Sequence, residues 1–155
     1  MGFVVTGLSS EPYRHLYGLS DNELAAHGVK RYVADATPGF PDRIEMRDAN
    51  LGENLLLLNH VSVEQDTPYK ASHAIFIREG AEQTYRGENE IPEVMFSRLL
   101  SLRAFDAEGM MIDANVAKGE EIKLVIERFF ENPQVSHIHA HNAVRGCYSG
   151  RIDRN

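Results

Sequence analysis

Hydrophobic side chains recur at helical spacing between residues 120 and 131, the strongest periodic signal in the chain. The apolar positions follow an i, i+3, i+4, i+7, i+8 pattern, which places them on one face of a helix. They are Ile122, Val125, Ile126, Phe129 and Phe130. Glu120 and Glu121 suit the positive end of this helix, and Asn132 with Pro133 ends it. The pattern predicts an amphipathic helix that packs on a sheet.

A second helix is predicted to begin at Ser20. Ser20 and Glu23 have the spacing of a capping box, while Leu19 and Leu24 have that of a hydrophobic staple. Gly28 is a natural C-terminal stop, because glycine readily adopts the left-handed conformation that closes a helix. This helix is therefore expected to have only about two turns.

The remaining apolar segments are short and rich in β-branched or aromatic residues, which is typical of strands. The predicted strands comprise residues 3–6, 29–34, 43–46, 55–63, 71–78, 99–105, 110–116, 135–141 and 148–153. Residues 106–109 read as a hairpin turn, and Pro92 suits the first turn of a third, short helix.

Several strands with hairpin-length connections and few helices predict an α+β fold. We expect a single domain over residues 1–155, with a mainly antiparallel sheet and helices packed on it. The apolar stripe of the long helix should be buried against a sheet that includes the strands near Leu57, Ile75 and Leu102.

The charge balance narrows the classes of partner. The chain has 155 residues, with 16 Lys and Arg against 23 Asp and Glu, a formal net charge of −7. An acidic domain is poorly suited to nucleic acid or to an anionic membrane surface, so we expect neither partner.

The longest aliphatic run, residues 55–58, is too short to span a bilayer. The N-terminal segment lacks the features of a secretory signal, and the single cysteine, Cys147, has no intramolecular disulfide partner. We therefore expect a cytoplasmic protein.

Three histidines lie at i, i+2 and i+4 near the C-terminus: His137, His139 and His141. On a strand, this spacing places all three on one face, with Ile138 and Ala140 on the other. If the apolar pair faces a core under a helix, the histidines line the opposite face of the sheet.

This histidine strand has three interpretations. A metal ion would bind His139 and His141, whose Cα atoms are about 6.6 Å apart on a strand, with a further ligand from elsewhere. That further ligand would be a residue such as His60, Asp113 or Cys147. We do not expect a metal, and the sequence identifies no cofactor.

The second interpretation of the histidine strand is a metal-free ligand pocket with histidine as acid, base or donor. The third is a polar sheet face with hydrogen-bonded or half-solvated imidazoles.

Other chemically capable side chains lie outside this strand. Cys147 would be a nucleophile if it met a histidine such as His141, but we favour an inert, buried thiol. Several arginines would bind a carboxylate or phosphate if they converged near the histidines, and otherwise form surface ion pairs. They are Arg78, Arg103, Arg145 and Arg151.

Four segments resemble a bacterial family catalogued as a domain of unknown function, DUF1203. They are ADATPGFPDRI, TPYKASHAIFIREG, SRLLSLRAFDAEGMMIDA and HAHNAVRGCYSGRIDR. Together with FVVTGL and SDNELAAHG, the resemblance extends over nearly the whole chain. It implies a single stand-alone domain and no established activity.

The family pattern carries over onto individual positions of this chain. They are His139, His141, Asn142, Gly146, Cys147, Arg151, Asp153, Tyr69, Ser72 and Arg78. The chain departs from the pattern at Asp42, where the family has cysteine, and at His73, where it has glycine. The resemblance therefore implies neither a second thiol beside Cys147 nor a shared role for His73.

The leading hypothesis is a small-ligand-binding protein, which the sequence does not resolve into enzyme or non-enzyme. Its site would centre on His139, His141 and Asn142. The two histidines would act as acid/base groups or metal ligands, and Asn142 would orient the ligand by hydrogen bonds. Further candidates around this centre are Cys147, Arg103 and Arg151, with Tyr69, Ser72 and Arg78 added by the resemblance.

The alternative hypothesis is a non-catalytic interaction module that works as a homo-oligomer, such as a homodimer, and has no ligand site. An exposed apolar patch around Phe40, Met110 or Met111 would favour it. A polar pocket beside the histidines would favour the first hypothesis.

Overall fold

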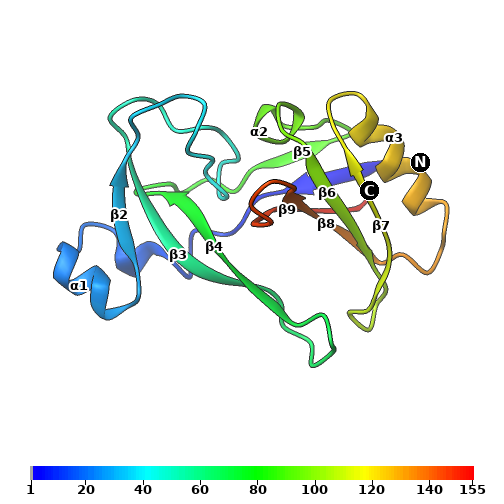
Figure 1. Ribbon diagram of the computed structural model, residues 1–155, viewed down its shortest axis with the longest axis horizontal. Helices are drawn as coiled ribbons and strands as arrows, with labels where there is room; N and C mark the ends of the chain where they lie inside the picture. Colours follow the sequence, from blue (N-terminus) through cyan, green and yellow to red (C-terminus); the bar gives the residue numbers. More distant parts are fainter. Residues whose placement is uncertain (1) are drawn as a thin grey trace.

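Two antiparallel sheets form the framework of the computed structural model, which describes residues 2–155 (Figure 1). The larger sheet has the strand order β5 (Arg86–Glu88), β1 (Phe3–Thr6), β9 (Tyr148–Arg154), β8 (His137–Asn142), β6 (Leu100–Phe105) and β7 (Met111–Ala117). The smaller sheet has the order β2 (Lys30–Val33), β3 (Asn54–Val63) and β4 (Ala71–Arg78). The helices are η1 (Arg14–Leu16, a 3-10 helix), α1 (Asp21–Ala26), α2 (Glu93–Phe96) and α3 (Glu121–Phe130). The predicted α+β class with antiparallel sheets is confirmed.

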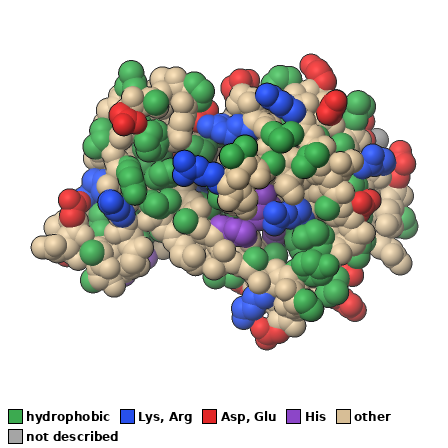
Figure 2. Space-filling view, viewed as in Figure 1, with side chains coloured by type: hydrophobic (Ala, Val, Ile, Leu, Met, Phe, Trp, Pro, Cys, Tyr) green, Lys and Arg blue, Asp and Glu red, His purple; other side chains and the backbone are tan. Residues whose placement is uncertain are grey.

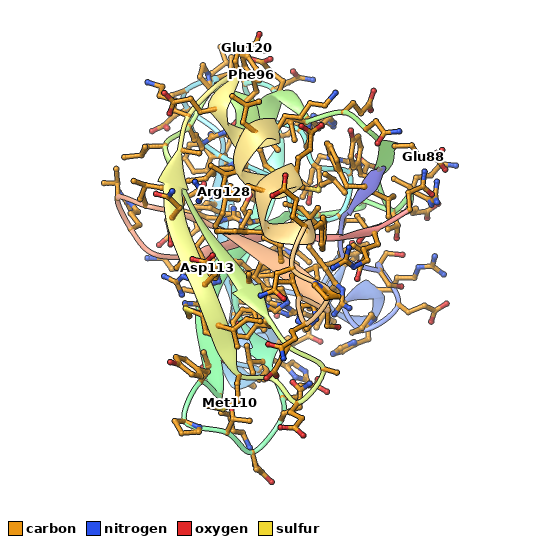
Figure 3. The ribbon with its side chains drawn as sticks, turned by 90° about the vertical axis from the view of Figure 1, so that its right-hand side faces the viewer. Glu88, Phe96, Met110, Asp113, Glu120 and Arg128 are labelled. Carbon is orange, nitrogen blue, oxygen red and sulfur yellow. The ribbon has the colours of Figure 1, made fainter. Side chains whose placement is uncertain are left out.

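Helix α3 covers one face of the larger sheet, beside β6 and β7 (Figure 3). All five residues of its apolar stripe are buried, as predicted, in one core with Leu102 of β6 and Ile138 and Ala140 of β8. Each large side chain buried there stabilises the fold by about 1.5–3 kcal/mol. Within residues 2–155, no helix has the length and apolar character needed to cross a membrane.

The smaller sheet has its own core, which corrects one prediction. Leu57 and Ile75 do not lie under α3, because their strands pair only with each other and with β2. Ile75 instead packs with Leu56, Leu58 and Tyr148 in a second cluster. Tyr148 belongs to β9, so this core joins the smaller sheet to the larger one.

Helix α1 begins with the predicted capping box. The Ser20 hydroxyl accepts the Glu23 backbone N–H at 3.2 Å, and the Glu23 carboxylate accepts the Ser20 N–H at 3.3 Å. Leu24 is fully buried, and Gly28 has a left-handed φ of 71° after the helix. These features fix a short helix where the sequence predicts one.

Residues 43–46 do not form the predicted short strand. The backbone turns here, and Met46 has a positive φ of 54°, which is incompatible with a strand. The turn is organised by buried Asp42, whose carboxylate accepts the backbone N–H groups of Glu45 and Arg78, each at 2.7 Å. An acidic side chain that bonds the backbone locally competes with strand pairing.

Strand β7 forms an edge of the larger sheet and pairs only with β6. Two of its backbone amides are occupied by neighbouring side chains on the same strand. The N–H of Ala114 donates to the Asp113 carboxylate at 2.8 Å, and that of Val116 donates to the Asn115 side-chain oxygen at 2.8 Å. The edge therefore presents fewer free donors than an ordinary edge strand.

Candidate functional site

The histidines of β8 lie on one face of the strand, as the alternation predicts. Ile138 and Ala140 point into the core under α3, so His137, His139 and His141 point to the opposite side of the larger sheet. This side is not a solvated polar surface. The three histidines are 7%, 3% and 2% exposed, because the smaller sheet lies over them.

The smaller sheet contributes two further histidines. His60 of β3 and His73 of β4 lie directly opposite each other. The His73 ring centre is 4.8 Å from that of His141, and the His60 ring centre is 5.0 Å from that of Tyr148. Tyr148 also contacts His139, with ring centres 5.3 Å apart. The fold thus assembles a histidine cluster consisting of His60, His73, His137, His139 and His141.

Burial keeps the histidine cluster neutral. Loss of hydration lowers the pKa of all five imidazoles, most strongly at His139, to about 3, and at His141, to about 4. The neighbouring imidazoles lower the pKa of His139 further, and the charge of Arg103 does so at His141. At neutral pH these rings are uncharged, so each has one nitrogen that donates and one that accepts.

The tautomer of His141 is set by the backbone. Its Nδ1 lies 2.9 Å from the carbonyl oxygen of Gly146, which can only accept a hydrogen bond. Nδ1 therefore carries the proton, and Nε2 presents a lone pair. Gly146 has a left-handed φ of 79° in the turn between β8 and β9, a conformation that glycine adopts at little cost.

Two other imidazoles have buried nitrogens without partners. His139 Nδ1 and His73 Nε2 are inaccessible to solvent and make no hydrogen bond within residues 2–155. Buried polar atoms without partners are rare in folded proteins and cost about 1–3 kcal/mol each. His60 differs, because its Nδ1 lies 3.1 Å from the Tyr13 hydroxyl.

A pocket of about 220 Å³ opens beside this cluster, between the β3–β4 hairpin and the β6–β7 hairpin. Its polar lining consists of Ser62, Tyr69, Lys70, His73, Arg103 and His141. Phe105 and Met111 supply apolar wall. The hairpin tips meet where the Thr67 hydroxyl donates to the Gly109 carbonyl at 3.1 Å. Figure 2 shows histidine side chains recessed in the middle of the molecule, with Lys or Arg side chains beside them.

Arg103 reaches this pocket from β6, where it is paired with His139 of β8. Its Nε donates to the Ser101 hydroxyl at 3.2 Å. Within residues 2–155, it forms no ion pair with a carboxylate. Partial burial without a counter-charge lowers the pKa of its guanidinium.

The structure brings together only some of the predicted ligand-binding residues. Tyr69 and Arg103 line the pocket with His141. Ser72 is exposed on the face of β4 opposite to His73. Arg78 lies at the other end of β4 and pairs with Glu45 at 2.9 Å, while Arg151 pairs with Asp153 at 2.9 Å. Neither of these arginines lines the pocket.

Cys147 and Asn142 form a separate polar group around a buried arginine. Arg43 is 2% exposed and donates to the Cys147 sulfur at 3.2 Å, and the Asn142 amide lies 3.6 Å from the same sulfur. Arg43 also donates to the backbone carbonyls of Pro41 and Tyr148. Cys147 is half-buried rather than fully buried as we expected, and its hydrogen-bond partners within residues 2–155 include no histidine.

Residues 2–155 do not bring together a complete set of metal ligands. Among residues 2–155, no three His, Cys, Asp or Glu side chains are grouped in a way that could hold a metal ion. The rings of the candidate pair, His139 and His141, have their centres 6.5 Å apart. The proposed additional ligand Asp113 is exposed on edge strand β7.

The convergence of His60 and His73 is not among the sequence-based predictions, although the sequence holds a signal for it. Each histidine continues an alternating apolar series, after Leu56 and Leu58 on β3 and before Ile75 and Ile77 on β4. Alternation places a histidine in such a series on the inward face of its strand.

One comparison with known proteins bears on this site. A family model described as "Protein of unknown function (DUF1203)" matches residues 39–154, a range that includes the whole histidine cluster and the pocket lining. No curated protein and no solved structure matches the chain. Since the matched range covers well over half of the sequence, the chain belongs to the DUF1203 family.

Proposed function

We propose that the protein binds a small molecule in the pocket between the β3–β4 and β6–β7 hairpins, with His141 as its main hydrogen-bonding group. The observation that carries the proposal is the fixed tautomer of His141, whose Nδ1 is held by Gly146 while the ring lines the pocket. A ligand that donates a hydrogen bond would satisfy the lone pair on Nε2.

One buried polar atom without a partner supports a ligand at this place. His73 lines the same pocket and has a buried Nε2 without a hydrogen bond. Small-molecule sites typically combine apolar walls with a few convergent polar groups, as Phe105 and Met111 do here with the histidines. The volume of about 220 Å³ lies below the roughly 300–1,000 Å³ of sites for drug-sized ligands, so the ligand should be small.

The low pKa of His141 favours binding over acid–base catalysis in the free protein. A general base works best when its pKa lies near the working pH, whereas that of His141 is about 4. His141 is therefore a weak base and a good hydrogen-bond acceptor at neutral pH. A bound negative charge would raise its pKa, so a catalytic role would require the ligand itself to activate the imidazole.

The alternative of a homo-oligomeric module without a ligand site has less support. The apolar side chains that would form its patch are half-buried: Phe40, Met110 and Met111. Phe40 packs against Phe76, with ring centres 5.3 Å apart, and Met111 forms part of the pocket wall. Phe40 and Met111 are therefore already engaged within the chain.

A fragment screen by two-dimensional amide NMR tests the proposal. The library contains neutral, cationic and anionic fragments, and binding should shift amide signals of residues 62–73 and 101–111. Ser62→Phe places a ring in the pocket and should abolish these shifts. Ser72→Phe is the matched control, because Ser72 is exposed on the outer face of the same hairpin.

Two outcomes contradict the proposal. One is a screen in which no fragment perturbs the pocket residues. The other is binding that persists equally in Ser62→Phe and Ser72→Phe, since the ligand would then lie elsewhere. A melting curve for each variant establishes that it is folded before its spectra are compared.

A further inference from the structure

We infer that the pocket selects small anions, with Arg103 binding a carboxylate or phosphate group and the apolar wall holding the attached organic body. This inference rests on the proposed small-molecule function and adds the chemical class of the ligand.

The first observation is that Arg103 stands apart from most arginines of the chain. Other arginine side chains form ion pairs with Asp or Glu: Arg14, Arg31, Arg47, Arg78, Arg86, Arg98 and Arg151. Arg103 has the Ser101 hydroxyl as its hydrogen-bond partner and no carboxylate partner within residues 2–155. In a protein with seven more acidic than basic side chains, counter-charges are plentiful. An arginine left without one on a pocket wall is available to an external anion.

The second observation is the sign of the charge around the pocket. Its lining contains two cationic side chains, Arg103 and Lys70, and no Asp or Glu. Lys70 pairs with Asp66 at 3.0 Å, but the Asp66 side chain is 93% exposed, so this pair is strongly hydrated. A concave site lined by one sign of charge concentrates ions of the opposite sign.

The third observation concerns the groups behind Arg103. His73 and His141 both feel its positive charge, which adds to the effect of burial in lowering the pKa of each imidazole. A bound anion would offset the positive charge of the guanidinium, which has no carboxylate partner within residues 2–155. The guanidinium is also planar and presents two parallel N–H donors, which match the two acceptor oxygens of a carboxylate or phosphate.

The apolar part of the pocket indicates the body of the ligand. Phe105 and Met111 lie on β6 and β7, and Pro68 with Tyr69 faces them from the other hairpin. The Tyr69 and Phe105 rings approach edge to face, with centres 6.4 Å apart. A flat, six-membered ring fits such a wall, because aromatic contacts favour offset or edge-to-face arrangements.

Three probes that share a phenyl ring test the charge preference: benzoate, its neutral ester methyl benzoate, and phenyl phosphate. Their dissociation constants are measured by NMR titration for the wild-type protein, Arg103→Gln and Arg128→Gln. Arg128→Gln is the matched control, because this substitution removes the same charge from an exposed side chain of α3, away from the pocket (Figure 3).

We expect benzoate or phenyl phosphate to bind the wild-type protein at least about tenfold more tightly than methyl benzoate, the gain from one charge-assisted contact. The preference should disappear in Arg103→Gln and persist in Arg128→Gln. Whichever anion binds more tightly distinguishes a carboxylate ligand from a phosphate ligand.

The results that would overturn the inference differ from those that would overturn the proposed function. Equal binding of methyl benzoate and both anions by the wild-type protein, or an anion preference that survives Arg103→Gln, refutes the anion assignment and leaves a small-molecule pocket. Binding of none of the three probes, together with a fragment screen that finds no ligand in the pocket, refutes both.

Discussion

The neutral histidine cluster should make the protein lose stability as the pH falls below about 6.5, before the carboxylates titrate. His139 and His141 have pKa values of about 3 and about 4 in the folded protein, against 6.5 for an unperturbed imidazole. Above pH 6.5, both rings are neutral in the folded and unfolded states. As the pH falls below 6.5, the unfolded chain binds protons at these histidines and the folded protein does not. The free energy of unfolding therefore decreases.

The magnitude follows from these values. As the pH falls from the unfolded-state pKa of such a histidine to its folded-state pKa, the free energy of unfolding decreases by about 1.36 kcal/mol per pH unit. From about pH 8 to about pH 5, each of the two histidines therefore removes about 2 kcal/mol, a total of about 4 kcal/mol. That is a large part of a typical unfolding free energy of about 5–15 kcal/mol. Glu53, whose pKa is held at about 2 by Arg47, loses its contribution only below its ordinary pKa of 4.5.

Urea denaturation at a series of pH values between about 5 and 8 measures this loss. The double variant His139→Gln/His141→Gln should lose about 4 kcal/mol less than the wild-type protein over this range, whatever its stability at pH 8. His27→Gln is the control, because it makes the same replacement at an exposed histidine outside the cluster. If the double variant and the wild-type protein lose stability equally between pH 8 and pH 5, the two imidazoles are not buried and neutral as described.

Two further predictions concern α3 and the thiol. Phe129→Ala should lower the free energy of unfolding by about 3–5 kcal/mol, because it leaves a cavity in the core. Leu124→Ala on the same helix should lower it by well under half of that, since Leu124 is 65% exposed. Similar urea midpoints for the two variants would contradict the packing of α3. Iodoacetamide should alkylate half-buried Cys147 in the native protein, but more slowly than in denaturant, as followed by mass spectrometry; equal rates would mean that the Arg43 contact does not shield the sulfur.

Local sequence patterns predict much of this fold. The stripe of α3, the capping box at Ser20 and the alternation along β8 each depend on residues a few positions apart, and the structure has all three. The division into two sheets depends on pairings between distant segments, and β3 gives no local sign that it avoids the strands under α3. The sequence predicts no strand at β5, because Arg86–Glu88 contains no hydrophobic alternation.

The candidate site was predictable in part. The inward direction of His139 and His141 follows from the register of one strand, but their coverage by His60 and His73 requires the second sheet to fold over them. The pocket itself exists because two hairpins from different sheets meet at Thr67 and Gly109. No local pattern specifies such a meeting, which is why Arg103 could be proposed as a ligand group but not distinguished from Arg78 or Arg151.

The side-chain contacts on β7 have a consequence for how the chain behaves at high concentration. An edge strand with free amides can recruit the same strand of another molecule and start an aggregate. Asp113 and Asn115 hold the amides of Ala114 and Val116, and Asp113 also puts a charge on the strand. A second molecule would have to break these local bonds before it could extend the sheet. Two short polar side chains on β7 thus oppose fibril growth through this edge of the larger sheet.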